Sequence, residues 1–359
     1  MTKRIFTQLS NISFLTLTLL ALSAGVASAQ TDDETFPDQN KVFADVDAGI
    51  AVTATYKYGD SGTGELERME STIFTLPAQS PLRTSVEKKL VDALDNASVD
   101  GTRVICQQLR VVGTPACVAR LESLLSDPER SAAARYALGG LKFVTAEKAL
   151  VRALGLTSGV ERIGVINTLG ELQAEAAVPT LVKLLGDSDE ATAIASAQAL
   201  GLIGGDDVVA ALNQAAANAS PALKIELNRA LLDCARGYVT QGKAESAVAI
   251  YESLGDAGPL FQNAAIRGLV LTKGADAVDS LVAAIGQGGA EAAYAASLIN
   301  LIDGSDATTA FAGQLAKVDD ETKVLLIRAL GNRGDSAAQK AIIELIESSE
   351  SEPVRAAGL

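Results

Sequence analysis

Apolar and polar positions alternate along most of the chain at the spacing of amphipathic helices, and one apolar position is always leucine. The clearest copies of this anchor stand in Ala137-Leu138-Gly139, Thr168-Leu169-Gly170, Ala199-Leu200-Gly201 and Ala329-Leu330-Gly331, with weaker copies at Leu109, Leu231, Leu269 and Leu298. Successive anchors are 29, 31, 31, 31, 38, 29 and 32 residues apart. Such a period indicates a solenoid, in which each unit buries its apolar face by stacking on its neighbours.

Each period contains an outer helix, a short polar turn and an inner helix. In the best-defined unit, Ala176 to Leu185 forms the outer helix, Gly186 to Asp189 forms the turn, and Ala191 to Ile203 forms the inner helix. We therefore predict an all-α fold, with the regular array over residues 98–359. Residues 41–97 are expected to form N-terminal helices that cap the array, over 41–58, 65–74 and 80–94, followed by a turn at 95–101.

The units resemble a known repeat family. The alternation of AVPTLVKLLGDSD with ATAIASAQALGLIG resembles the short HEAT-like repeats named after phycobilisome lyases. The stretches VICQQLRVVG, SAAARYALGGL, GVINTLGEL and RALGNRGD make the array similar to HEAT-repeat segments of exported proteins from planctomycete-type bacteria. The resemblance implies a right-handed α-solenoid, a HEAT/armadillo-type superhelix of antiparallel helix pairs. It also implies a concave surface, lined by inner helices, on which partners commonly bind.

The single 38-residue spacing has a different pattern. Residues near 228–260 resemble one tetratricopeptide unit, because the following residues fall at that motif's spacings: Ala235, Tyr238, Gly242, Ala247, Tyr251 and Pro259. Tyr238 and Tyr251 are expected to pack between the two helices of this unit rather than to stack on a ligand.

The N-terminus has the features of a secretory signal peptide over residues 1–29. Lys3 and Arg4 precede an apolar stretch, and Ala27-Ser28-Ala29 forms a cleavage site after Ala29. We expect a periplasmic or secreted protein with no integral membrane segment after cleavage. Residues 30–40 form an acidic segment that is expected to be flexible. At the other end, the chain stops at Leu359 although the next anchor is due near 361, which predicts a truncated array.

Composition excludes several kinds of chemistry. The 359 residues include no histidine, so a serine–histidine–acid triad and a His-ligated zinc cannot form within this chain. The formal net charge of −14 disfavours nucleic acid as a partner. The three cysteines are expected to be buried thiols. Cys106 stands about seven residues before the turn that it shares with Cys117, and Cys117 about three residues after it, so the two are staggered by roughly 6 Å along helices whose axes lie roughly 9 Å apart. A disulfide needs Cα atoms within about 7 Å. We expect no catalytic residues, no cofactor and no metal.

Three short motifs are interpreted as loops or turns. Gly59-Asp60-Ser61-Gly62 matches the nucleophile box of a serine protease but has no histidine to serve it. The acids near Asp303-Gly304-Ser305-Asp306 do not follow the calcium-loop pattern. Gly204-Gly205 lacks the lysine and hydroxyl of a phosphate-binding loop.

One polar position recurs two residues before each anchor. It holds, in chain order, Gln107, Tyr136, Asn167, Gln198, Arg229, Arg267, Ala296 and Arg328. Seven of these eight residues can form hydrogen bonds, so stacking the units would align them as a ladder along the inner helices. Solvent-facing positions are commonly polar in any protein, which is the simpler interpretation. The functional interpretation is a groove for an extended or helical peptide, with its C-terminal half biased positive by the three arginines.

We therefore expect an exported, non-catalytic scaffold that binds a protein or peptide partner on the concave face. The alternative is the non-catalytic repeat region of a larger exported enzyme, with a sugar-active or electron-transfer domain beyond residue 359. A third class, a lyase or chaperone for a cofactor-bearing protein, depends on the repeat's family name alone.

Overall fold

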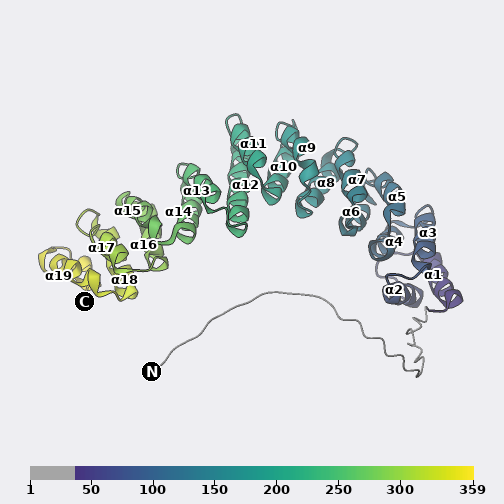
Figure 1. Ribbon diagram of the computed structural model, residues 1–359, viewed down its shortest axis with the longest axis horizontal. Coiled ribbons are helices and arrows are strands. Elements are labelled where there is room, and N and C mark those ends of the chain that lie inside the picture. The colour runs from purple at the N-terminus through teal and green to yellow at the C-terminus, as the bar shows by residue number, and fades with distance from the viewer. Residues whose placement is uncertain (1–36) are drawn as a thin grey trace, which may run out of the picture. The chain divides into compact units, whose positions relative to one another are not determined.

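The computed structural model describes residues 37–359, and all regular structure in that range is helical. Asp38–Leu359 form one compact unit, in which the helices follow one another in chain order as a curved row (Figure 1). This arrangement confirms the predicted all-α solenoid. The predicted signal peptide, its cleavage site and residues 30–36 of the acidic segment lie outside the described residues.

The second and third N-terminal helices begin and end within two residues of the predicted positions, whereas the first, expected over 41–58, already ends at Thr53. The helices of this part of the chain are α1 (Gln39–Thr53), α2 (Gly64–Thr75), α3 (Leu82–Ala93) and α4 (Val99–Val112). The turn expected at 95–101 is shorter than predicted, because Ser98 caps α4 and the helix starts one residue later. The Ser98 hydroxyl accepts a hydrogen bond from the Gly101 N–H at 2.9 Å, which satisfies one of the free donors at the helix N-terminus.

The array continues as pairs of antiparallel helices, with an odd-numbered outer helix and an even-numbered inner helix in each pair (Figure 1). The helices are α5 (Val118–Ser123), α6 (Ser131–Gly140), α7 (Val144–Ala153), α8 (Gly159–Glu171), α9 (Val178–Leu184), α10 (Glu190–Ile203), α11 (Asp206–Ala216), α12 (Pro221–Thr240), α13 (Ala244–Ser253), α14 (Pro259–Lys273), α15 (Val278–Gly286), α16 (Gly289–Leu298), α17 (Ser305–Ala312), α18 (Asp320–Arg333), α19 (Gln339–Ser348) and α20 (Glu352–Ala357). Short 3-10 helices connect some of them: η1 (Pro115–Cys117), η2 (Glu175–Ala177), η3 (Gly274–Ala277), η4 (Ile299–Leu301) and η5 (Ser336–Ala338).

The anchor leucines form the centre of the packing. All eight are buried, from Leu109 in α4 to Leu330 in α18. Glycines that follow some anchors let the inner helices approach closely. A Cβ atom added at Gly201 would lie 2.7 Å from the Cα of Ala230, and one added at Gly170 would lie 2.8 Å from the Cα of Ala199. The leucine therefore determines how deeply each inner helix is buried, and the glycine determines how closely neighbouring inner helices pack.

The long anchor spacing comes from an extended inner helix. α12 has 20 residues and continues past Leu231 as far as Thr240, whereas α10 ends three residues after Leu200. Tyr238 and Tyr251 are buried in the pair formed by α12 and α13, as expected for core residues of a helical hairpin. The assignment of this pair as a tetratricopeptide unit remains a prediction.

The apolar interior is divided at this irregular pair. One cluster of buried residues runs from Val42 to Leu269, and a second runs from Val270 to Val354. The boundary lies within α14, between two consecutive residues. The array therefore has two cores, which meet at the helix that follows the long unit.

Candidate functional site

The residues of the predicted ladder lie on successive inner helices and are exposed. This holds for all seven polar members, which are Gln107, Tyr136, Asn167, Gln198, Arg229, Arg267 and Arg328. Two residues correspond to about 200° around an α-helix, so a position two before a buried anchor turns away from the core. The eighth position differs, because Ala296 is buried in the second core and the next residue, Ser297, is exposed instead.

Contacts between neighbouring inner helices occur at two members of the ladder, Gln198 and Tyr136. The Gln198 side-chain amide in α10 donates to a Glu226 carboxylate oxygen in α12 at 3.0 Å. The other Glu226 oxygen accepts from the Arg229 guanidinium at 2.6 Å. Farther toward the N-terminus, the Arg110 guanidinium of α4 lies 4.3 Å from the ring centre of Tyr136 in α6. The polar positions of adjacent units are thus in register.

The expected positive bias of the C-terminal half is only partly present. Arg229 forms an ion pair with Glu226, so its charge is largely balanced within α12. Arg267 and Arg328 form no ion pair with any of the described residues. Arg267 and Arg328 therefore each offer an unpaired cation on the inner helices, whereas Arg229 lies beside a carboxylate of its own helix.

The inner surface also carries large apolar side chains that the sequence reasoning did not identify. Several lie near the C-terminal ends of the inner helices and are at least 39% exposed: Val111, Leu172, Leu202 and Leu271. Tyr136 is 51% exposed. Their sequence signal is a large apolar residue two or three positions after the anchor. These side chains place exposed apolar area beside the hydrogen-bonding side chains of the ladder.

A hollow of about 450 Å³ lies on this surface beside Tyr136. Its walls include Arg110, Arg135 and Glu171. The Arg135 guanidinium donates to the Gly164 carbonyl at 3.1 Å, and a Cβ at Gly164 would lie 2.3 Å from the guanidinium carbon. Burial lowers the pKa of Arg135, although Glu171 and another nearby carboxylate oppose the shift. The absence of a side chain at Gly164 therefore makes room for a half-buried cation between α6 and α8.

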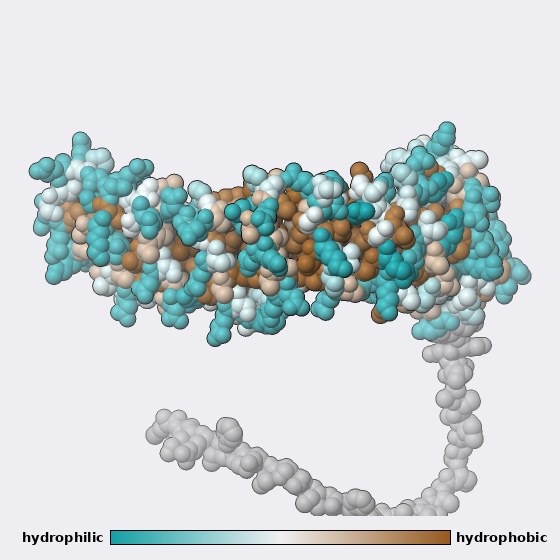
Figure 2. Space-filling view, turned by 90° about the horizontal axis from the view of Figure 1, so that it is seen from above, coloured by the Kyte–Doolittle hydropathy of each residue, from teal (hydrophilic) through white to brown (hydrophobic). Residues whose placement is uncertain are grey.

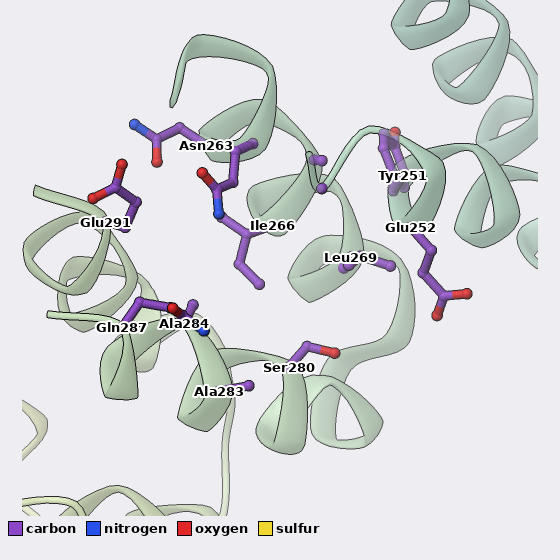
Figure 3. Close-up of a pocket in the computed structure, with 13 residues that line it drawn as sticks. Tyr251, Glu252, Asn263, Ile266, Leu269, Ser280, Ala283, Ala284, Gln287 and Glu291 are labelled. Atoms are coloured by element: carbon purple, nitrogen blue, oxygen red, sulfur yellow. The ribbon is translucent and has the colours of Figure 1, made fainter. Parts of the chain in front are cut away.

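A second cavity lies between two consecutive helix pairs, α13–α14 and α15–α16. It has a volume of about 290 Å³ (Figure 3). Ile266 and Leu269 of α14 line it on one side, and Ala283 of α15 lines the facing side.

Figure 2 views the array from the side of the outer helices and shows hydrophobic atoms along its middle, bordered by hydrophilic ones. The array thus has an inner polar ladder and a separate apolar cavity.

The Gly59–Gly62 and Gly204-Gly205 motifs are loops or turns in the structure, whereas the Asp303–Asp306 motif lies outside a helix only at Asp303 and Gly304, because α17 begins at Ser305. Asp60 accepts a hydrogen bond from the Lys57 N–H at 2.8 Å, which closes the exposed loop between α1 and α2. Gly204 and Gly205 both have positive φ angles, as the sharp turn between α10 and α11 requires. Within residues 37–359, no cluster of three or more acidic or cysteine side chains is arranged to hold a metal ion. No helix in that range is long and apolar enough to cross a membrane.

All three cysteines are free thiols within the core. Cys106, Cys117 and Cys234 are buried, as expected. Burial is the main cause that raises the pKa of each thiol to about 12. For Cys117, the nearby Glu87 carboxylate raises the pKa further. These thiols are packing residues and not nucleophiles at neutral pH.

Comparison with known proteins identifies the repeats. Residues 147–232, from α7 to α12, match the family model for HEAT repeats. A search of curated proteins gave no match.

Three solved structures resemble the chain at low identity. An engineered protein is 18% identical, with 88% of this chain and 97% of that chain covered and a TM-score of 0.37. The complex of CpcE and CpcF of phycocyanin lyase from Nostoc sp. PCC7120 is 21% identical, with 66% and 94% covered and a TM-score of 0.32. Human deoxyhypusine hydroxylase in complex with glycerol is 19% identical, with 78% and 96% covered and a TM-score of 0.32. At this level of similarity, none of the three indicates what the chain does. The chain is therefore an all-α solenoid with HEAT repeats at its centre.

Proposed function

We propose that the chain is an exported, non-catalytic scaffold that binds a protein partner along its inner helices. The observation that carries this proposal is the exposed polar ladder on successive inner helices, interspersed with exposed apolar side chains. Arrays of HEAT repeats typically serve protein interaction, which supports the same function. The export part of the proposal depends on the predicted signal peptide.

The bound partner would be an extended or helical segment that crosses several units. Each unit would offer it one hydrogen-bonding side chain from the ladder, such as Asn167 or Gln198, and one apolar side chain, such as Leu172 or Leu202. A repeated, in-register surface favours a partner that is itself regular, because the same contacts recur at each unit. Arg267 and Arg328 favour carboxylates in the part of the partner that lies over α14 to α18.

Site-specific photo-crosslinking tests the inner surface directly. A photoreactive amino acid would be placed at Gln198 on α10 and, as the control, at Lys148, which is exposed on the outer helix α7. The full-length gene would be expressed in its own host, and adducts would be identified by mass spectrometry. We expect a defined protein adduct at Gln198 and none at Lys148. Equal labelling at both positions, or none at either, would refute binding along the inner helices.

Charge reversal then tests the arginines against the partner that the crosslink identifies. Arg267→Glu with Arg328→Glu should weaken its binding, whereas Lys142→Glu with Lys148→Glu removes the same charge elsewhere and should not. Unchanged affinity in the first variant, with an intact circular dichroism spectrum, would remove the arginines from the site. In the same host, the N-terminal sequence of the exported protein should begin at Gln30.

A further inference from the structure

The outer layer of the array is interrupted on both sides of α13. Elsewhere each outer helix packs on the next one, as α5 does on α7 and α15 on α17, or on the 3-10 helix that directly precedes the next one, as α7 does on η2 and α17 on η5. α13 packs on α12 and α14 but makes few or no contacts with α11 or α15. The interruption coincides with the long anchor spacing and with the division of the core at Leu269 and Val270. The packing of the outer layer, the anchor spacing and the core therefore all change at the same place.

The cavity between α13, α14 and α15 is the opening that this interruption leaves. Its floor is apolar, with half-buried Ile266 and buried Leu269 contributed by α14. The facing side of α15 presents Ala283 and Ala284. In the regular unit, Leu184 of α9 occupies the position that corresponds to Ala284, counted from the preceding anchor, and packs against the first core. At α15 that volume is not filled by the chain itself.

The rim of this cavity is acidic. Glu252 at the end of α13 and Glu291 at the start of α16 lie at opposite sides of the opening (Figure 3). No lysine or arginine lines the cavity. Lys273 lies 3.7 Å from a Glu252 oxygen and balances only one of the two carboxylates. Arg236, which is close enough to Tyr251 to oppose the rise in its pKa that burial causes, forms an ion pair with Asp233. The chain as a whole carries a formal charge of −14, so the surrounding field does not favour an anion.

We propose that this cavity is a docking site for an amphipathic helix of a protein partner. A large apolar side chain of that helix enters between Ile266 and Ala284, and lysine or arginine residues beside it approach Glu252 and Glu291. An apolar floor of this kind takes the apolar face of a helix, with anchors spaced three or four residues apart. The docked helix supplies the packing that α13 and α15 do not give each other. This site is separate from the inner ladder and does not depend on it.

Selection from a peptide library tests the proposal. A phage-displayed library of 16-residue helical peptides would be selected on the full chain, and enriched peptides would be measured by fluorescence polarisation. We expect net-basic sequences with Leu, Phe or Met three or four residues apart. Ala284→Leu, which fills the cavity as Leu184 does in the regular unit, should weaken binding at least tenfold.

A surface variant keeps the test valid if Ala284→Leu alters the fold. Glu252→Lys with Glu291→Lys should weaken binding about tenfold at low salt and less at high salt, because added salt screens the charge contribution. Glu347→Lys with Glu350→Lys makes the same charge change on exposed residues at and after the end of α19 and should change the affinity less than twofold.

Three outcomes would overturn the proposal. The first is that no peptide is enriched, or that the enriched peptides are acidic. The second is that binding is unchanged in both cavity variants. The third is a concentration-dependent dimer in sedimentation equilibrium that Ala284→Leu abolishes, since the occupant would then be a second copy of this chain.

Discussion

Replacing the glycine after an anchor with alanine tests whether close approach of the inner helices holds the array together. Gly201 is buried in α10, and an added Cβ would lie 2.7 Å from the Ala230 Cα and 3.1 Å from the Ala230 carbonyl oxygen of α12. Both obstacles are backbone atoms, so no side-chain rotation can remove the clash. α10 and α12 must instead separate by about 0.7 Å to bring the closest pair to a tolerable contact.

The expected magnitude follows from two opposing effects. Overpacking of this kind costs about 1–3 kcal/mol, because neighbouring residues must shift. Alanine favours the helix over glycine by about 1 kcal/mol, which offsets part of that cost. Gly201→Ala should therefore lower the free energy of unfolding by up to about 2 kcal/mol, within the range of ordinary destabilising mutations. Gly170→Ala should behave in the same way, since its Cβ would lie 2.8 Å from the Ala199 Cα.

Gly331 provides a matched control within the same motif. It follows the anchor Leu330 in α18, but an added Cβ would meet no atom within 4 Å. Gly331→Ala should therefore stabilise the chain, by up to about 1 kcal/mol, through helix propensity alone. Urea denaturation followed by far-ultraviolet circular dichroism measures both variants, and hydrogen exchange shows whether the loss is localised to α10 and α12. If Gly201→Ala stabilised the chain as much as Gly331→Ala, close helix approach would not be the role of this glycine.

Two further predictions concern buried groups. Glu87 of α3 is buried and accepts hydrogen bonds from the Thr114 N–H at 2.8 Å and the Cys117 N–H at 3.1 Å. Glu87→Ala leaves those donors unpaired and should lower the free energy of unfolding by about 2–4 kcal/mol in urea denaturation, whereas Glu87→Gln should lower it less. Equal losses in the two variants would show that the volume of the side chain matters and not its acceptor atoms. The native thiols should react with Ellman's reagent far more slowly than those of the urea-unfolded chain, because burial raises the pKa of each to about 12 from 9.0. The same shift in pKa makes the free energy of unfolding fall as the pH rises from 9 toward 12, because the unfolded chain loses its thiol protons first. Cys234→Ala should reduce that fall. An unchanged pH dependence in this variant would count against a raised pKa of the Cys234 thiol.

Much of the fold could be predicted from the sequence because the repeat fixes many positions at once. A recurring leucine identifies the buried side of each inner helix, and helical geometry then places the polar residues two positions earlier on the exposed side. The same logic failed at Ala296, because α16 shifts its exposed position by one residue to Ser297. The pairing of Arg229 with Glu226, three residues earlier on the same helix, is a further feature that the ladder pattern does not include.

Other features depend on contacts that spacing does not reveal. The bond between Glu87 and Thr114 joins a helix to a turn 27 residues later, and nothing in the local pattern of either segment specifies the partner. The cavity beside α14 depends on how far α13 stands from α15. The sequence marked the region only through its 38-residue spacing, which locates an irregularity without giving its geometry.

The boundary between Leu269 and Val270 has a thermodynamic consequence. In a linear array, the coupling between neighbouring units determines how far unfolding spreads from one end. We expect coupling across α14 to be weaker than coupling within either block, so the chain should melt in two stages, with one block folded while the other melts. Any process that pulls on the C-terminal end would then unravel residues after Val270 while the segment before it kept its structure.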